Sequence, residues 1–307
     1  MQVIGEVRDK RGELLFSMFT STVSARRGHY YAHHHAAHEL TLVRSGTGKY
    51  RAAREYEIDA GDAFFFKNSE PHCVCDVESG EMTFLNLHIT PYYFWYIGER
   101  GGAFGTAFLQ KRFAGNRLLE LLGEAGLSHV SALMAKMEGE LTERAEGYAL
   151  IAESYLNDIL VTLCRCALPT VEKPEYGGRA SRIYESLRQI DEQFCQPLEL
   201  SELARRVNLE KTYYSALFKR VIGISPWEYI LIKRIERATE LLRMTDKSVL
   251  EIALCCGFNN TANFNKHFKK HTATTPRAFR HMEKGVACPE EESLINRNPA
   301  VAVIADG

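Results

Sequence analysis

Hydrophobic and polar residues alternate in short runs along the first 90 residues. Between about residues 6 and 90 these runs include ELTLVR, KYRAAREYEI, AFFFK and MTFLNLHI, each followed by a turn-forming sequence such as SGTG, DAGD or NSEP. Alternation with a period of two, closed by Gly, Asp, Asn or Pro, predicts β-strands joined by hairpins. Several short strands at this spacing predict a small β-barrel or sandwich over residues 1–104.

The hydrophobic spacing becomes helical between residues 105 and 168. Leu133, Met137 and Leu141 are four residues apart, and the run from Ile151 to Leu163 has a similar spacing. This spacing predicts two amphipathic helices that connect the barrel to the rest of the chain. The prolines and glycines of PTVEKPEYGG predict an interdomain linker over residues 169–178. Residues 286–307 contain an acidic run and are predicted to form a flexible tail.

The region after the linker, residues 179–285, contains an internal repeat. The run FKR at 218–220, followed by a proline at 226, recurs fifty positions later as FKK followed by a proline at 276. Ala204, Val207 and Leu209 recur 49 positions later as Ala253, Cys256 and Phe258. The repeat therefore predicts a duplicated helical unit. Residues 226–244 have helical spacing without an interior Pro or Gly, so they predict a long helix that joins the two copies.

Each copy has the pattern of two helices joined by a tight turn. In the first copy we expect Ser201 to cap a helix, Asn208 to adopt the left-handed conformation of the turn, and Gly223 to end the second helix. In the second copy Ser248 is the predicted cap and Gly257 the predicted turn residue. Both copies therefore predict helix-turn-helix units.

The second helix of each copy has a polar outward face. Helical periodicity turns Tyr214, Leu217 and Phe218 inward in the first copy, and Phe264 and Phe268 inward in the second. The outward positions are Lys211, Thr212, Ser215, Ala216 and Lys219 in the first copy, and Thr261, Ala262, Asn263, Asn265 and Lys266 in the second. Asn can pair with adenine edges and Lys with guanine, so these faces suit readout of DNA bases in the major groove.

Charge is distributed unevenly between the two predicted domains. Residues 179–284 contain 19 lysines and arginines against 12 aspartates and glutamates, a net charge of +7. The whole chain of 307 residues has a net charge of -1, so the remainder carries -8. A basic domain attached to an acidic one is expected when only the first meets phosphates.

Composition places the chain among soluble intracellular proteins. We expect a cytoplasmic protein without a secretory signal, because the N-terminal sequence MQVIGEVRDKRGE has no apolar core and no apolar span of 18 residues follows. The eight cysteines lie mostly in apolar stretches and are predicted to be reduced, buried thiols. The length of 307 residues predicts two domains, and the strands followed by helices predict an α+β fold. No membrane contact is expected.

The sequences of the two helical units resemble those of AraC/XylS-family transcription regulators. The matching runs are LSELARRVNLEKTYYSALFKRVIGISPWEYI and SVLEIALCCGFNNTANFNKHFKKHTATTPRAF, and the region that contains them, residues 179–285, is about a third of the chain. The resemblance implies two recognition helices that enter successive major-groove segments about 34 Å apart. By position it gives as base-contacting residues Lys211, Thr212, Ser215, Ala216, Thr261, Ala262, Asn263, Asn265 and Lys266. The family usually has Gly where this chain has Ala273, so a left-handed cap there would cost up to about 1 kcal/mol.

The predicted barrel carries a histidine-rich segment that resembles the first cupin motif. Gly28, His33, His35, Glu39 and Gly46 match it, although the spacing between Gly28 and the first histidine is one residue short. Alternation puts His33, His35 and Glu39 on one face of a strand. The two remaining histidines of this segment, at positions 34 and 38, have the opposite parity and are expected at the surface or rim.

A second stretch resembles the other cupin motif. Gly61 is followed eleven positions later by His72, while Lys67 and Ser69 replace the usual Pro and Gly. Together the two stretches support an N-terminal cupin-like β-barrel. The resemblance to AraC/XylS-family regulators implies that this barrel senses a small-molecule effector, with a sugar as the first class expected. The predicted walls of the effector site are His33, His35, Glu39, Thr41 and His72.

The resemblance leaves a divalent metal as an alternative to an organic effector. In metal-bearing cupins the matching ligands would be His33, His35, Glu39 and His72, and three imidazoles with one carboxylate suit a transition metal. Apart from this metal ion, the sequence predicts no cofactor. The aromatic run of Tyr92, Tyr93, Trp95 and Tyr96 is interpreted as core rather than as a platform for stacking sugars.

The predicted function is that of a sequence-specific transcription regulator, not an enzyme. Its expected partners are promoter or operator DNA, the effector, a second copy of the chain paired through residues 128–168, and RNA polymerase. Two rivals remain: a metal-dependent cupin enzyme or metal sensor fused to a DNA-binding domain, and a DNA-packaging protein that binds through phosphates alone.

Overall fold

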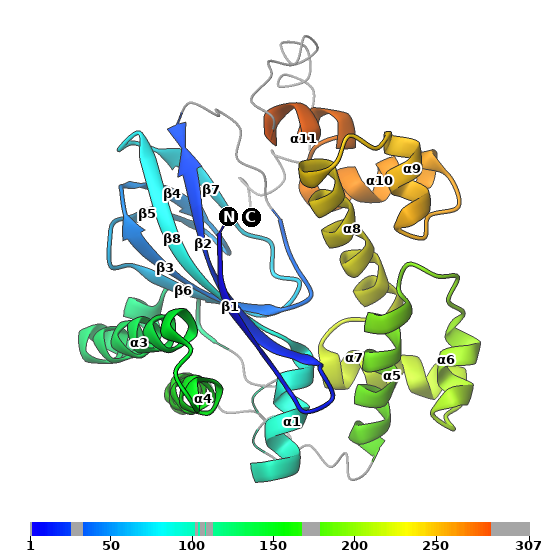
Figure 1. The fold of residues 1–307 in the computed structure, drawn as a ribbon, viewed down its shortest axis with the longest axis horizontal. Helices are drawn as coiled ribbons and strands as arrows, with labels where there is room; N and C mark the ends of the chain where they lie inside the picture. The colour runs from blue at the N-terminus through cyan, green and yellow to red at the C-terminus, as the bar shows by residue number, and fades with distance from the viewer. Residues whose placement is uncertain are drawn as a thin grey trace.

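A computed structural model describes residues 2–25, 33–101, 104, 108, 113–167 and 179–283 of the chain. The predicted linker at 169–178 and the predicted tail at 286–307 lie outside the described residues, as does most of 105–112. The fold is α+β, as the sequence predicts, with strands in the first 90 residues and helices after them (Figure 1).

The strands form two antiparallel sheets that share a core. Their bounds are β1 Gln2–Arg8, β2 Leu14–Ser24, β3 His38–Ser45, β4 Gly48–Arg51, β5 Glu55–Ile58, β6 Ala63–Phe66, β7 Cys73–Val77 and β8 Glu81–Ile89. One sheet has the order β1-β2-β8-β3-β6 and the other β5-β4-β7. Alternating residues of the two sheets, such as Phe64, Phe84 and Tyr50, are buried together between them. Burial of this apolar surface holds the sheets face to face.

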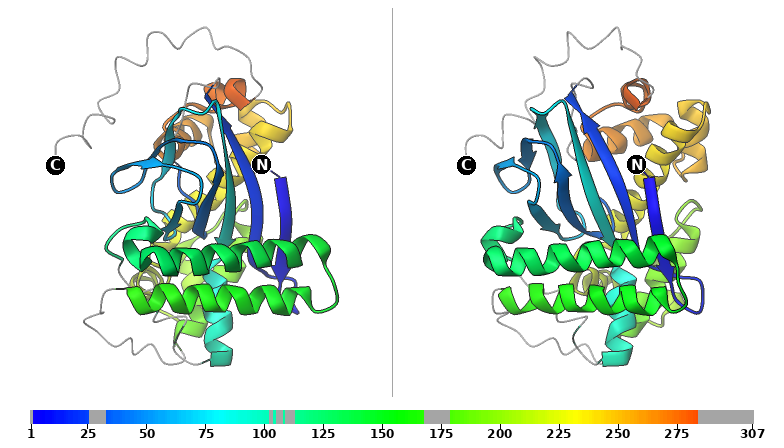
Figure 2. Two further views of the ribbon diagram at one scale, coloured as in Figure 1. Left: turned by 90° about the vertical axis from the view of Figure 1, so that its left-hand side faces the viewer. Right: turned by 60° about the vertical axis from the view of Figure 1, so that its left-hand side comes forward.

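The predicted connecting helices form an antiparallel hairpin beside the larger sheet (Figure 2). It consists of α3 Leu118–Glu143 and α4 Tyr148–Cys166, which follow α1 Pro91–Gly101. Leu133, Met137 and Leu141 of α3 are buried, as their spacing predicts, and α3 contacts α4, β1 and β6. The hairpin therefore completes the core of the N-terminal domain, residues 2–167, which is called the sensor domain below because the sequence predicts that it binds an effector.

Helix α3, Leu118–Glu143, is long and apolar enough, by length and composition alone, to cross a membrane. The expectation that the sequence lacks such a span was therefore wrong as a statement about composition. The helix is interrupted at Gly123, whose φ of 68° and ψ of 179° are not helical, and its buried residues belong to the core of the sensor domain. These features are those of an amphipathic helix packed against a core.

The second domain consists of helices from α5 onwards. Their bounds are α5 Arg179–Gln193, α6 Leu200–Arg206, α7 Lys211–Ile222, α8 Pro226–Met244, α9 Val249–Cys255, α10 Thr261–Thr272 and α11 Pro276–Glu283. The pairs α6–α7 and α9–α10 correspond to the two predicted helix-turn-helix units. The long α8 runs from one to the other, as predicted (Figure 1).

The turns and caps follow the sequence signals except at one position. Asn208 has a φ of 54°, Gly223 closes α7 with a φ of 96°, and Ser248 forms a capping box with Glu251. Ser201, however, does not cap α6. The helix begins at Leu200, which packs against the core, and Glu199 is its N-cap residue.

Gly257 is required by the turn of the second unit. Its φ is 81°, and an added Cβ would lie 2.6 Å from the carbonyl oxygen of Cys195. A side chain here would strain the backbone and collide with the segment before α6.

Ala273 occupies a left-handed C-cap position, with a φ of 57°, and is exposed. We therefore expect Ala273→Gly to stabilise the chain by up to about 1 kcal/mol, because glycine adopts this conformation without a Cβ clash. Calorimetric unfolding of the full chain measures the effect. The matched control is Ala216→Gly, exposed inside α7, which should destabilise by about 1 kcal/mol. A loss of stability in both variants would contradict the cap assignment.

Candidate DNA-binding surface and effector site

The predicted base-contacting residues lie on the outer faces of α7 and α10. Tyr214, Leu217 and Phe218 point into the core from α7, and Phe264 and Phe268 do so from α10. The exposed positions are Lys211, Thr212, Ala216, Ala262, Asn263, Asn265 and Lys266, while Ser215 and Thr261 are half-buried. The side-chain hydroxyl of Ser215 donates to the carbonyl oxygen of Lys211 (3.0 Å).

Two side chains at the start of these helices are committed to capping. The carboxylate of Glu210 accepts hydrogen bonds from the backbone N–H groups of Thr212 (2.8 Å) and Tyr213 (3.0 Å). The side-chain oxygen of Asn260 accepts one from the N–H of Asn263 (2.8 Å). These caps fix the first turn of each helix, from which recognition helices contact base edges.

The predicted effector residues surround the buried carboxylate of Glu39. In the antiparallel pairing of β3 with β8, Glu39 lies opposite His88 and Thr41 lies opposite Asn86. Glu39 Oε2 lies 2.6 Å from His35 Nε2, 2.8 Å from His88 Nε2 and 3.7 Å from His72 Nε2. The hydroxyl of Thr41 donates to the second carboxylate oxygen of Glu39. The structure therefore brings four of the five predicted residues together around one carboxylate.

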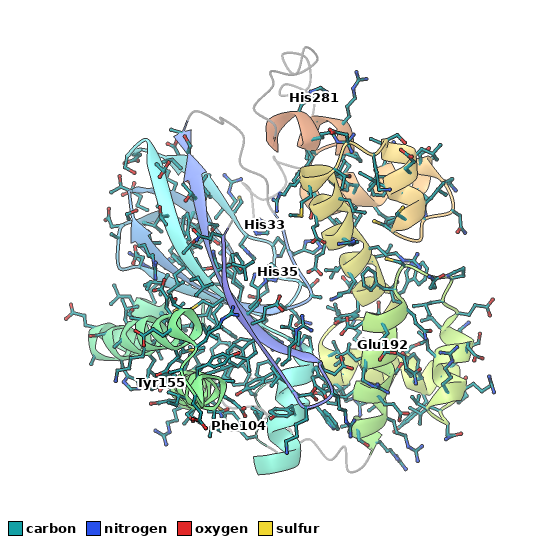
Figure 3. The ribbon with its side chains drawn as sticks, in the orientation of Figure 1. His33, His35, Phe104, Tyr155, Glu192 and His281 are labelled. Atoms are coloured by element: carbon teal, nitrogen blue, oxygen red, sulfur yellow. The ribbon has the colours of Figure 1, made fainter. Side chains whose placement is uncertain are left out.

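His33 lies at the edge of this group. It is exposed, and its backbone pairs with that of His72, with N–H to O distances of 2.9 and 3.0 Å. The His33 ring is 4.5 Å from the His72 ring, centre to centre. His33 and His35 are labelled in Figure 3, on the side of the sheets that faces α8.

Electrostatics couple Glu39 to its neighbours. Burial alone would raise the pKa of Glu39, but the rings of His35 and His72 hold it well below its usual value. Burial likewise opposes the charge of His35, yet the attraction and hydrogen bond of Glu39 raise the pKa of His35 above its ordinary value. The low-dielectric interior makes this mutual stabilisation strong.

The donor set fits a divalent metal ion. The Nδ1 atoms of His35 and His72 are each 2.9 Å from a backbone carbonyl, of Ala37 and Glu70 respectively, which turns Nε2 of each ring toward the Glu39 carboxylate. Among the described residues, His72 Nε2 is buried without a hydrogen-bond partner. The ligand atoms of His33, His35 and His72 lie within 4.8 Å of one another, and so do those of His35, Glu39 and His88.

Sequence reasoning missed His88 and misplaced His38. The alternation in MTFLNLHI gives His88 the same parity as Asn86 and Phe84, so the signal was present. His38 was expected at the surface or rim, but it is fully buried on the other face of β3, against the rings of Phe65 and Phe94. Burial there lowers the pKa of His38 well below its ordinary value. His38 is buried because α1, which contains Phe94, covers the face of β3 that was predicted to be exposed.

The segment between His33 and His38 also touches the helical domain. The N–H of Ala36 donates to the Glu236 carboxylate on α8 (2.8 Å), and the His34 ring hydrogen-bonds to that of His271 on α10. Asn68 donates to the carbonyl oxygen of Ile222, at the end of α7 (2.9 Å). The sensor domain therefore contacts α7, α8 and α10.

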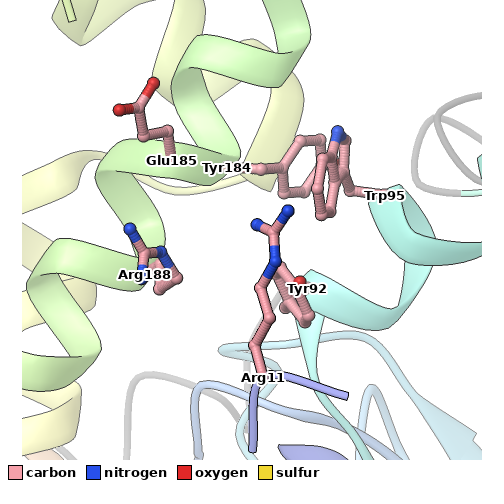
Figure 4. Close-up of a pocket in the computed structure, with 6 residues that line it drawn as sticks. All are labelled: Arg11, Tyr92, Trp95, Tyr184, Glu185 and Arg188. Carbon is pink, nitrogen blue, oxygen red and sulfur yellow. The ribbon is translucent and has the colours of Figure 1, made fainter. Parts of the chain in front are cut away.

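A second part of this interface contains a cavity of about 230 Å³. Figure 4 shows its lining residues, which are Arg11, Tyr92, Trp95, Tyr184, Glu185 and Arg188. The Trp95 ring stacks on that of Tyr184 at 6.0 Å, so this aromatic residue of α1 packs against α5. Tyr92 and Tyr93 are buried, as expected of core residues. None of the predicted effector residues lines this cavity.

Comparisons with known proteins agree with this division of the chain. Residues 17–160 match the AraC-like ligand binding domain family, and residues 203–282 match the helix-turn-helix domain family. The HTH-type transcriptional activator RhaS of Klebsiella pneumoniae is 25% identical over 250 residues, covering 81% of this chain and 86% of that protein. The melibiose operon regulatory protein of Escherichia coli is 33% identical over 109 residues, 35% of this chain and 36% of that protein.

A solved structure shares the fold over most of the chain. ToxT from Vibrio cholerae, with unsaturated fatty acid bound, superimposes with a TM-score of 0.54 at 14% identity, covering 89% of this chain and 98% of ToxT. The sheet domain, the paired helix-turn-helix units and these matches define a DNA-binding transcription regulator with an N-terminal ligand-binding domain. The chain belongs to the AraC/XylS family, which confirms the resemblance drawn from its sequence.

Proposed function

We propose that this regulator is a cytoplasmic protein without enzymatic activity whose DNA binding is controlled by a small molecule held at Glu39, His35, Thr41, His72 and His33. The observation that supports the effector site is the buried polar cluster itself. Burying a carboxylate among imidazoles costs free energy that an apolar core would avoid, so such clusters gather at functional sites. The similar proteins are named as transcription regulators, which favours a sensor over a cupin enzyme.

A sugar remains the leading effector class in this proposal. Hydroxyl groups can accept from imidazole N–H groups and donate to the Glu39 carboxylate. One similar protein is named for the melibiose operon. A thermal-shift screen of sugars and small metabolites tests the proposal, because a ligand that binds only the folded chain raises its unfolding temperature.

Promoter or operator DNA is the proposed partner of α7 and α10, and RNA polymerase is a further one. The base-reading residues in this proposal are Lys211, Thr212, Ser215, Ala216, Thr261, Ala262, Asn263, Asn265 and Lys266. Selection of tight-binding duplexes from a random pool by the full chain defines the site they read. A DNA-packaging protein, the alternative function, would select no preferred sequence, because phosphate contacts alone carry no sequence information.

We expect Asn263→Ala and Thr212→Ala each to weaken binding by about 1 to 3 kcal/mol at one position of the selected site, because each removes a base contact. Binding titrations with the selected duplex and its single-base variants give this measurement. Thr22→Ala, an exposed hydroxyl on β2 of the sheet domain, is the control and should leave affinity unchanged. An equal loss on random DNA would refute the assignment of base readers.

A divalent metal ion is the second candidate effector, favoured by the unpartnered Nε2 of His72. His33, His35, His72, His88 and Glu39 would hold it, and it would supply a positive charge that draws these side chains together. If a metal ion is the effector, Zn²⁺ should raise the unfolding temperature of the wild-type chain but not that of His72→Ala. The control His129→Ala, an exposed histidine of α3, keeps the response. If Zn²⁺ does not change the unfolding temperature of the wild-type chain, the metal candidate is excluded and the organic effector is retained.

The proposed homodimer pairs the outer face of the α3–α4 hairpin with its copy. Leu150 is 66% exposed and Ile151 39% exposed on α4, apolar surface that a partner can cover. We expect Leu150→Glu to weaken self-association by at least roughly tenfold in analytical ultracentrifugation, because it buries a charge. Leu254→Glu, 54% exposed on α9, is the matched control. A wild-type monomer at every concentration, with and without DNA, contradicts the dimer.

A further inference from the structure

Two cysteines lie side by side on β7, at the edge of the smaller sheet. Cys73 Sγ and Cys75 Sγ are 3.7 Å apart, and both residues are free thiols. Cys73 is 5% exposed, as predicted for a buried thiol, whereas Cys75 is only half-buried. A small solute can therefore reach the sulfur of Cys75, and a second sulfur lies next to it.

The backbone of β7 is irregular at this pair. Asp76 lies opposite Lys49 of β4, but Val74 lies opposite the next residue, Tyr50, so Cys75 is the extra residue of a β-bulge. Val74 points into the core between the sheets, which leaves the two cysteines on the other face. Bulges interrupt the hydrogen-bonded ladder and often lie next to functional sites, where they redirect a side chain.

The surroundings of Cys75 favour its thiolate form. Arg51 of β4 lies opposite Cys73 in the strand pairing. The hydrogen bond from the Cys73 thiol and the charge of Arg51 lower the pKa of Cys75, against the opposing effects of burial and of Glu55. A cysteine beside a cation, open in part to solvent and next to a second thiol has the surroundings of a readily oxidised thiol.

We propose that Cys73 and Cys75 are an oxidation site, a dithiol that hydrogen peroxide converts to a disulfide, with Cys75 as the attacking thiol and Cys73 as the resolving thiol. The Cys75 thiolate attacks one peroxide oxygen, the O–O bond breaks, and the hydroxide that leaves takes up the proton that Cys75 lost. Cys75 is then a sulfenic acid. The Cys73 sulfur attacks the Cys75 sulfur, the S–O bond breaks, and the leaving hydroxide takes the Cys73 proton to form water. The peroxide gains the two electrons that the thiols lose.

The spacing of the two residues permits this bond. Alternate residues of a strand have Cα atoms about 6.6 Å apart, within the upper limit of about 6.8 Å for a disulfide. The sulfur atoms must approach from 3.7 Å to a bond length of about 2.05 Å, and the bulge gives the backbone room to adjust. A disulfide near this limit is readily reduced by small thiols, so the modification is reversible.

Mass spectrometry of the full chain after treatment with stoichiometric hydrogen peroxide tests the site. We expect a disulfide within the peptide that contains Cys73 and Cys75, while Cys164 and Cys166 on α4 stay free and are alkylated. This second pair has the same spacing and is also accessible, but residues two apart on a helix do not face each other, so it is the matched internal control. An unmodified Cys73–Cys75 pair, or equal oxidation of both pairs, overturns the proposal.

Variants test the two roles. In Cys73→Ser the sulfenic acid of Cys75 has no resolving thiol, so it should persist and react with dimedone, whereas in Cys75→Ser the thiol of Cys73 should stay reduced. A sulfenic acid on Cys73 in Cys75→Ser overturns the assignment of the attacking thiol. The wild-type measurement does not depend on either variant, so the oxidation site stays testable if one of them fails to fold.

Arg51→Ala should slow the oxidation of Cys75 about threefold at neutral pH, because loss of the neighbouring cation lowers the fraction of thiolate. Rapid mixing with peroxide, followed by alkylation at successive times, gives the rate. Lys49→Ala, which removes a cation from the same face of β4, is the matched control and leaves the rate unchanged. An equal rate in Arg51→Ala and the wild type overturns the role of Arg51.

Discussion

The buried carboxylate of Glu39 is the constraint on which the site and its surroundings depend. A charge in the interior persists only when several partners compensate for its lost hydration. Here β8 supplies His88, Thr41 lies two residues along β3, and the chain before β3 must fold back so that His35 can reach the carboxylate. That fold-back presents His34 and Ala36 to the helical domain. One electrostatic requirement therefore shapes both the proposed effector site and the domain interface.

The two helix-turn-helix units are attached to the sensor domain in different ways. Apolar packing continues from the sheets through α1 into α5, α6, α7 and the first half of α8. The second unit has a core of its own, made by the later part of α8 with α9, α10 and α11. The first unit is therefore fixed to the sensor by a shared core. The second depends on α8 and on polar contacts such as that between His34 and His271.

The parts of the fold that were predictable from the sequence are those with local causes. Asn208, Gly223 and Gly257 mark turns whose backbone conformations few residues adopt, and the repeat made their meaning plain. The cluster around Glu39 was predictable from two sources: alternation, which places His35, Glu39 and Thr41 on one face, and the resemblance to the cupin motifs, which supplies His72. Glu236 was not, because it lies 200 residues from Ala36 along the chain and no periodicity connects the two. The burial of His38 was missed for a similar reason, since the covering helix follows much later in the chain.

The unbroken α8 has a consequence for the DNA that this protein reads. Its 19 residues form a rod about 28 Å long, close to the distance between neighbouring major-groove faces. Because α8 is a single rigid helix, it cannot lengthen when base pairs are inserted between two half-sites. Each added base pair also rotates one half-site about the DNA axis relative to the other. Genuine operators should therefore have a spacer of constant length, whatever its composition, and single-nucleotide insertions there should be as damaging as the loss of a whole half-site.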